Sequence, residues 1–226
     1  MEYITARSFS SVYILFDIIW LGIFTGILIY KRKYTAIVIG FLAGILYYLV
    51  DFGLFYHALG TRAVEGAQTG WLLLWLSMSY GYTNFVWIWL LLEDGKHWLE
   101  WSLLPVLGWL TVGLLAQNFD HFGTTIHIHR GIKSYHGIMA LILCAGYLIL
   151  ILRNLRDSEE RAPIGKLLLI GIGVQFAWES ALLISGIRPY GLMPLIINSL
   201  IETNLGMPYI YLIHRALLRK KYFASF

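Results

Sequence analysis

Long apolar runs are the feature that most constrains the fold of this chain. Seven runs, each about long enough to cross a bilayer as a helix, follow one another between residues 11 and 214. Within lipid every backbone amide needs a partner inside the protein, and continuous apolarity without two-residue alternation favours helices over a barrel. The sequence therefore predicts transmembrane helices over residues 11–30, 35–57, 70–92, 99–117, 137–152, 165–187 and 191–214.

The composition is that of an integral membrane protein. Of the 226 residues, 58% are hydrophobic and only 13% are charged, and the mean hydropathy is +0.68. Soluble domains carry about 25% charged residues, so an ordinary globular protein is excluded. We expect one all-α transmembrane domain over residues 1–226, with no room for a separate soluble catalytic or DNA-binding domain. The first run lacks the flanks of a cleaved signal peptide, so we interpret it as a retained span.

The distribution of basic residues predicts the orientation in the membrane. Basic clusters lie on alternate connections, at residues 31–33, 153–166 and 214–221. The positive-inside rule then places the N-terminus outside, or in a lumen, and the C-terminus in the cytoplasm. The formal net charge of +4 reflects this topology and does not indicate a nucleic-acid partner. The single cysteine, Cys144, excludes an intrachain disulfide.

Two short motifs indicate an internal repeat. Residues 79–84 and 199–204 both read S-x-x-[Y/E]-T-N, and an aromatic–Ile–aromatic triplet follows each of them. One predicted helix earlier, Asp51 and Glu179 occupy matching places. The matched helices run in the same direction, which predicts a 3+1+3 plan of parallel repeats with the fourth helix as a connector. Proteins built in this way commonly place their site between the two halves.

Four carboxylates fall within the predicted spans: Asp17, Asp51, Glu179 and Glu202. A charged carboxylate at the bilayer centre costs at least about 2.5–3.5 kcal/mol, so such residues usually mark a function. No Lys or Arg lies deep in a predicted span, and an unpaired carboxyl in low dielectric stays protonated near neutral pH. We therefore expect the acids to border one cavity, with catalytic candidates Glu202, Asp51 and Glu179. The alternative is that some acids only cross-link helices, and we favour it for Asp17.

Aromatic residues are abundant near these acids. Their π faces stabilise a carbocation without supplying a nucleophile that would quench it. A buried acid with aromatic walls is what proton-initiated cyclisation of a polyene or epoxide requires. The candidate substrate-binding residues are Tyr47, Tyr48, Tyr80, Tyr82, Trp87, Trp178, Asn204 and Tyr209.

A histidine-rich loop over residues 120–136 offers possible metal ligands. It contains Asp120, His121, His127, His129 and His136. We interpret it as a solvated loop and expect no metal there. The chain also lacks an aspartate-rich diphosphate motif, a glycine-rich nucleotide loop and a lysine in the last predicted helix for a Schiff base, so no cofactor is expected.

The chain resembles the small integral-membrane terpene cyclases of meroterpenoid and indole-terpenoid biosynthesis. These have a comparable length, about seven spans, and an essential acid on the second helix and on the last. The second-helix motif of the family is Trp-Glu within an apolar stretch, and Val50-Asp51 occupies the matching place here. Trp178-Glu179 on the sixth predicted helix also resembles this motif, as the repeat would explain.

The last-helix pattern of the family is an acid, a glycine four residues later and then aromatic residues. It is matched here by Glu202, Gly206, Tyr209 and Tyr211. The resemblance implies an enzyme that protonates and cyclises a lipophilic prenylated or epoxidised substrate, without a cofactor.

Two other functions remain open from the sequence alone. A small-solute transporter, possibly proton-coupled and of SWEET-like 3+1+3 architecture, would use the same carboxylates, although the paired proline motifs of that family are absent from the first and fifth predicted helices. A structural or assembly subunit is the third reading.

Overall fold

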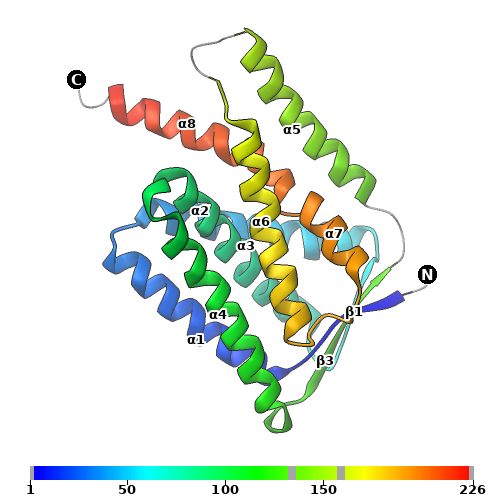
Figure 1. The fold of residues 1–226 in the computed structure, drawn as a ribbon. Helices are drawn as coiled ribbons and strands as arrows, with labels where there is room; N and C mark the ends of the chain where they lie inside the picture. Colours follow the sequence, from blue (N-terminus) through cyan, green and yellow to red (C-terminus); the bar gives the residue numbers. More distant parts are fainter. Residues whose placement is uncertain (1–2, 132–135, 157–160, 224–226) are drawn as a thin grey trace.

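The structure is a computed structural model that describes residues 3–131, 136–156 and 161–223 (Figure 1). It is mostly helical. In chain order the main elements are β1 (Tyr3–Ser10), α1 (Ser11–Tyr30), α2 (Tyr34–Tyr48), η1 (Leu49–Ala58), β2 (Arg62–Glu65), α3 (Thr69–Glu93), α4 (Trp98–Asn118), β3 (Thr125–Gly131), α5 (His136–Arg156), α6 (Ile164–Ile184), α7 (Leu192–Ile201), η4 (Asn204–Gly206) and α8 (Met207–Phe223). Here η1 is a π-helix that continues α2, and η4 is a 3₁₀ turn.

Within the residues that the structure describes, five helical segments are long and apolar enough to cross a membrane. They are Ser11–Tyr30, Tyr34–Ala58, Gly95–Asn118, Gly137–Arg156 and Ile164–Ile184. Their outer surfaces carry many exposed large apolar side chains, as expected for helices that face lipid. The protein is therefore a helical, multi-pass membrane protein.

Helix α3 is the most enclosed element of the bundle. Its 25 residues are long enough to span, but polar and aromatic side chains lower its mean hydropathy, and residues 79–91 are all buried. Gly44 of α2 and Gly81 of α3 let the two backbones approach closely, since a Cβ on Gly81 would lie 2.9 Å from the Gly44 Cα. Small residues at helix crossings serve this purpose in membrane proteins.

The last predicted helix, over residues 191–214, is broken. Helix α7 ends at Ile201, and α8 begins at Met207 after the turn η4. Pro208 has no N–H to donate to a carbonyl of the preceding turn, so the hydrogen-bond ladder of α7 does not continue through it, and Pro208 lies in the first turn of the new helix α8. The acid Glu202 lies at this break.

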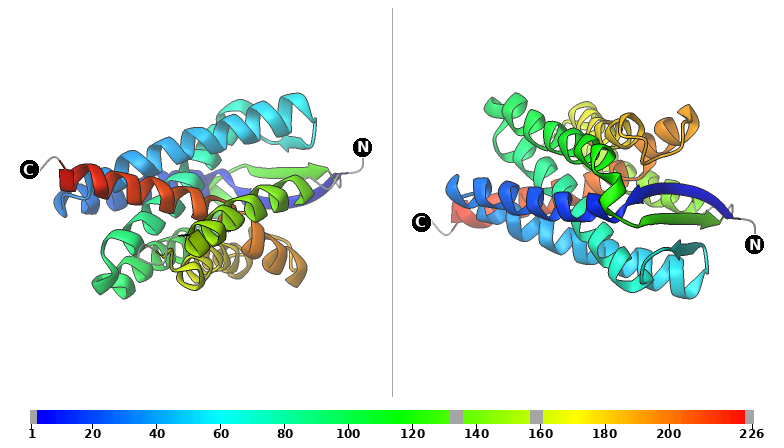
Figure 2. Two further views of the ribbon diagram at one scale, coloured as in Figure 1. Left: turned by 90° about the horizontal axis from the view of Figure 1, so that it is seen from above. Right: turned by 90° about the horizontal axis from the view of Figure 1, so that it is seen from below.

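A small antiparallel sheet, which the sequence did not predict, covers one end of the bundle. Its strand order is β1-β3-β2. Strand β1 precedes α1, β2 lies in the connection before α3, and β3 lies in the connection between α4 and α5. The N–H of Ser8 in β1 donates to the carbonyl of Ile187, which attaches the α6–α7 connection to the sheet. Figure 2 shows the strands on the opposite side of the molecule from the free end of α8. The N-terminal strand and three connections therefore meet at this end.

Candidate functional site

One arginine from each of these four segments enters the end of the bundle. Arg7 belongs to β1, Arg62 to β2, Arg130 to β3, and Arg188 to the α6–α7 connection. Arg7, Arg62 and Arg188 are buried, and Arg130 is partly buried. Side chains alternate between the two faces of a strand, so Arg130 in β3 lies on the same, inward face as the buried Ile126 and Ile128. This alternation explains why Arg130 enters the bundle.

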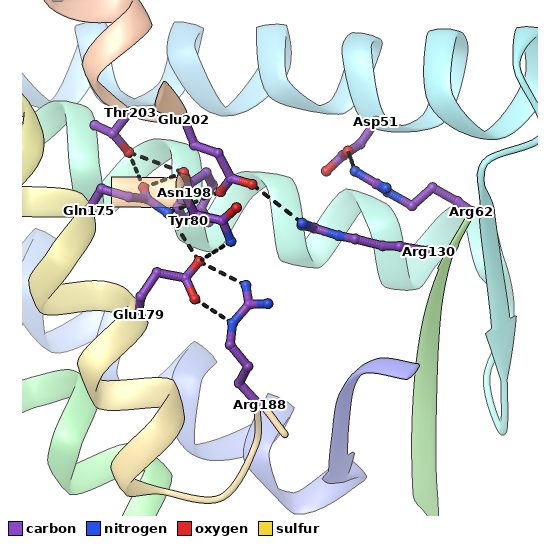
Figure 3. Close-up of polar contacts among 10 residues, drawn as sticks. All are labelled: Asp51, Arg62, Tyr80, Arg130, Gln175, Glu179, Arg188, Asn198, Glu202 and Thr203. Carbon is purple, nitrogen blue, oxygen red and sulfur yellow. Dashed lines mark hydrogen bonds and ion pairs between the residues drawn. The ribbon is translucent and has the colours of Figure 1, made fainter. Parts of the chain in front are cut away.

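Three of the four candidate acids pair with these arginines (Figure 3). Arg62 Nη2 lies 3.1 Å from Asp51 Oδ1, and Arg130 Nη1 lies 3.3 Å from Glu202 Oε1. The expectation that the acids are unpaired is therefore wrong. The arginines lie outside the apolar helices in the sequence, but the chain folds them back onto the helix ends.

The third pair joins Glu179 of α6 to Arg188: Arg188 Nη2 donates to Glu179 Oε1 at 2.8 Å, and Arg188 Nε forms an ion pair with Oε2. Gln175 Nε2 and Asn198 Nδ2 also donate to Glu179 Oε1, each at 3.2 Å. The side chain of Glu179 has no exposed area. Oε1 thus accepts three hydrogen bonds, while the enclosed Oε2 faces Arg188 through the ion pair alone.

A network of polar side chains links Glu179 to Glu202. Gln175 Nε2 donates to Glu202 Oε2 at 3.0 Å as well as to Glu179, while its Oε1 accepts from the hydroxyls of Tyr80 and Thr203. Asn84 Nδ2 on α3 donates to Thr203 Oγ1 at 3.0 Å. The two S-x-x-[Y/E]-T-N motifs therefore touch each other, although one lies within a continuous helix and the other at the α7–α8 break.

The three acids differ in exposure. The side chain of Asp51 is 20% exposed and that of Glu202 is 10% exposed, whereas Glu179 is sealed. Figure 3 shows the carboxylates of Asp51 and Glu202 on the same side of the guanidinium groups of Arg62 and Arg130, and the charge of Arg62 also acts on Glu202. Asp51 lies in the π-helix η1, and π-helical segments are frequent at functional sites.

Asp17 lies apart from this cluster. Its carboxylate is fully buried on α1 and accepts a hydrogen bond from the Trp75 indole N–H at 2.8 Å. This contact joins α1 to α3, so Asp17 is a cross-linking residue, as favoured from the sequence.

Arg7 differs from the other three arginines because no carboxylate in the described part of the chain pairs with it. Its side chain lies over the ring of Trp178, with Cζ 6.0 Å from the ring centroid, and its Nε is buried without a hydrogen bond. Burial, and then the charges of Arg188 and Arg130, lower the pKa of Arg7 to about 10. The guanidinium therefore remains charged at neutral pH.

Three of the candidate substrate-binding residues border the cluster. Tyr47 packs edge-on against Tyr80 with ring centroids 5.1 Å apart, and Tyr80 contacts Trp178 at 5.6 Å. Trp178 in turn packs against Trp109 at 4.8 Å. These rings form an aromatic wall on the helix side of the carboxylates.

The other five candidates lie elsewhere. Tyr48 stacks on Phe52, the Tyr82 hydroxyl bonds to Thr25, Trp87 donates to Ser102, Asn204 accepts from Tyr147, and Tyr209 donates to the Ile142 carbonyl. Each contact joins helices or turns of the scaffold.

The histidine-rich loop is largely strand β3. His127 and His129 lie on its outward face, 6.1 Å apart between ring centroids, and His129 lies 3.4 Å from Glu65 of β2. The side chain of His136 is outside the described part. Among the residues that the structure describes, no group of three or more His, Cys, Asp or Glu could hold a metal ion.

A cleft at the sheet end of the bundle is separate from the acids. It has a volume of about 460 Å³ and lies between β1, α4 and the α6–α7 connection, where its lining includes Ser8, Gln117 and Ser185. None of the four acids lines it. The chemistry of the cluster, and not the size of this cleft, is the reason for choosing the cluster as the candidate site.

The four arginines are the residues that sequence reasoning missed as site residues. A signal was present in residues 125–130, which alternate apolar and polar types as a half-buried strand does. Such a strand next to a helix end brings its inward charged residue to the bundle.

Comparisons with known proteins give no relative of this chain. No family model matches it, and no curated protein or solved structure is detectably similar.

Proposed function

We propose that the protein is a membrane-embedded enzyme of the terpene cyclase type, which protonates and cyclises a lipophilic prenylated or epoxidised substrate. The observation that carries the proposal is that Asp51 and Glu202 both lie close enough to Arg62 and Tyr47 for their charges to interact with them. The two acids come from different helices, retain exposed area, and have the aromatic rings of Tyr47, Tyr80 and Trp178 beside them.

The reaction uses one carboxyl as acid and the other as base. Glu202, which lies next to Tyr80 through Gln175, donates its proton to the alkene or epoxide of the substrate. The electron pair of the alkene, or of a neighbouring one, closes the ring, and the aromatic wall stabilises the cation. A proton then leaves the cation to Asp51, which forms the product alkene and restores charge balance.

The arginines set a condition on this cycle. Arg130 lies 3.3 Å from the Glu202 carboxylate and favours its ionised form at rest, so Glu202 must gain a proton before each turnover. The final proton on Asp51 is available for this return, because the two carboxylates lie on the same side of the Arg62 and Arg130 guanidinium groups (Figure 3). In each cycle Glu202 therefore donates a proton, Asp51 accepts one, and the proton on Asp51 returns to Glu202.

Amide substitution tests the assignment. Glu202→Gln keeps the volume of the side chain but cannot donate an acidic proton, so product formation in detergent should fall about 10²–10⁴-fold. Asp51→Asn should fall similarly. Glu65→Gln, an exposed glutamate at the same end of the bundle, is the matched control and should retain wild-type activity. Unchanged turnover in both site variants would reject the acid–base roles.

Transport is the second candidate, and the break between α7 and α8 favours it. Discontinuous helices form the substrate sites of many transporters, and Glu202 lies at the break. A proton-coupled carrier of SWEET-like 3+1+3 architecture would accumulate solute in proteoliposomes under a proton gradient, without product formation. Product formation in detergent, where no gradient exists, supports the enzyme instead.

The complete topology is also a proposal. We infer seven spans with the N-terminus outside, in which α1–α3 repeat as α5–α8 around an axis along the membrane normal. Both halves place an acid near the sheet end of a helix and its arginine 11 or 9 residues later. Labelling of a Lys31→Cys variant from outside intact cells would contradict the orientation, and an experimental structure in which Asp51 and Glu179 fail to superpose would contradict the repeat.

A further inference from the structure

The four arginines and three carboxylates of the candidate site cannot all form one-to-one ion pairs. Arg62, Arg130 and Arg188 each face one carboxylate, and these pairs use all three acids of the cluster. Arg7 remains as a fourth buried cation that forms no ion pair among the described residues, although the charges of Glu179 and Glu202 act on it from a distance. Four arginines face three carboxylates, so the cluster holds one more positive charge than negative, and an anion from outside the described chain would neutralise it.

The surroundings of Arg7 fit an anion better than they fit a purely structural role. The guanidinium lies over Trp178, and its buried Nε makes no hydrogen bond. Arg130 and Arg188 are close enough for their charges to act on Arg7. Three guanidinium groups with planar N–H donors provide the geometry that binds carboxylate and phosphate oxygens.

We propose that Arg7, together with Arg130 and Arg188, binds the carboxylate or phosphate group of an amphiphilic ligand. The inference rests on the proposed function because it assigns the substrate class of the same site: a lipophilic molecule with an anionic group. The group binds Arg7, while the apolar part lies along Tyr47, Tyr80 and Trp178. The anion thus holds the reactive double bond or epoxide at a fixed distance from Glu202.

Equilibrium binding to the full-length protein in neutral detergent tests the site. The probes are oleate and oleyl alcohol, which share the chain and differ in charge. Oleate should bind more tightly than the alcohol, and Arg7→Gln should weaken oleate binding about 10- to 100-fold without affecting the alcohol. Arg156→Gln, an exposed arginine at the opposite end of the bundle, is the matched control. Equal oleate affinity in Arg7→Gln and the wild type would overturn the proposal.

The source of the anion follows from competition with bound oleate. Inorganic phosphate should displace oleate if a free phosphate enters, whereas phosphatidylglycerol, and not phosphatidylcholine, should displace it if the ligand is a membrane lipid. Competition by neither restricts the ligand to a carboxylate. Each of these results supports an anion site and differs only in the occupant.

Thermal stability separates a ligand site from a structural arginine. Removal of an unpartnered buried charge should leave the ligand-free melting temperature of Arg7→Gln equal to or above the wild-type value, and should abolish the increase on adding oleate. If Arg7→Gln fails to fold, Arg7→Lys retains the charge without the planar donors and should still bind oleate more tightly than oleyl alcohol; equal binding of the two probes by Arg7→Lys would reject the site. Binding is measured without turnover, so an inactive protein that binds oleate rejects only the cyclisation.

Discussion

Two acid–arginine pairs of this protein share a plan and differ in environment. Asp51 pairs with Arg62, 11 residues later, and Glu179 pairs with Arg188, 9 residues later. In both, the acid lies on a helix and the arginine lies in the connection that follows. Yet Glu179 is sealed and accepts from Gln175, Asn198 and Arg188, whereas Asp51 is 20% exposed with one hydrogen bond from Arg62.

The connections explain the difference. The N–H of Ser8 holds the α6–α7 connection at Ile187, which draws Arg188 into the bundle beside Glu179. Arg62 instead lies on the edge strand β2, so its partner Asp51 remains at the rim. The same arrangement in the chain therefore produces a structural pair in one half and a reactive candidate in the other.

The largest effect is expected from neutralising the sealed pair. Glu179→Gln leaves Arg188 buried opposite an amide, and breaking a buried ion pair typically costs about 3–5 kcal/mol. The free energy of unfolding in mixed micelles, measured by titration with a denaturing detergent, should fall by that amount. A loss below about 1 kcal/mol would contradict the comparison.

A double variant controls for the loss of shape. Replacement of both partners, Glu179→Gln with Arg188→Met, removes the uncompensated charge and should recover most of the lost stability. If the double variant is as unstable as Glu179→Gln, hydrogen bonds from Gln175 and Asn198 contribute more than the ion pair.

The second effect concerns activity in place of stability. Asp51→Asn removes a charge at a partly exposed site, so stability should change by less than about 1 kcal/mol. Turnover should nevertheless fall about 10²-fold or more because the amide cannot accept a proton from the cation. An Asp51→Asn variant as unstable as Glu179→Gln would make the two pairs equivalent and remove the basis for assigning them different roles.

The sequence predicted the helices better than the charge pairing. Apolar runs identify spans because lipid requires them, and carboxylates within those runs stand out by their cost. Arginines near the ends of spans, in contrast, are usually interpreted as evidence for membrane orientation. The sequence therefore did not indicate that Arg62 and Arg188 enter the bundle. Their positions depend on strand pairing between residues far apart in the chain, such as Ser8 with His127.

The end of α7 shows a signal that was present but overridden. Gly206 and Pro208 both disfavour a continuous helix after Glu202. Because the residues around them are apolar, the whole segment remained long enough to be predicted as one membrane span. Hydropathy therefore predicted one helix where the structure has two.

The third effect tests whether the halves pack alike. Gly81 faces Gly44 across α3 and α2, and a Cβ on Gly171 of α6 would lie 3.0 Å from the Asn204 Cα. Gly81→Ala and Gly171→Ala should each cost about 1–3 kcal/mol of unfolding free energy, since backbone cannot move aside easily. Gly22→Ala on α1 meets no atom within 4 Å and is the control, with no loss expected. If only one of Gly81→Ala and Gly171→Ala lowers the unfolding free energy, the two halves of the protein do not share this close helix packing.

The smallest effect extends the comparison to a pair at the opposite end of the bundle. Asp94 accepts hydrogen bonds from Trp101 and Lys33 and bonds to His97, and the His97 contact is the main cause that lowers its pKa to about 2. Because this pKa lies below the value of about 3.9 in an unfolded chain, Asp94 stabilises the fold above about pH 4 and loses its contribution as the pH falls towards 2. Solvent screens this partly exposed pair, so Asp94→Asn should cost less than about 1 kcal/mol at pH 7, and the cost should shrink as the pH falls from 4 towards 2, where about half of the folded-state carboxyls are still ionised. Unfolding free energies of the variant and the wild type, measured at both pH values, should therefore approach each other in acid. A difference that is as large at pH 2 as at pH 7, or that matches that of Glu179→Gln at pH 7, would show that burial does not decide what these pairs contribute.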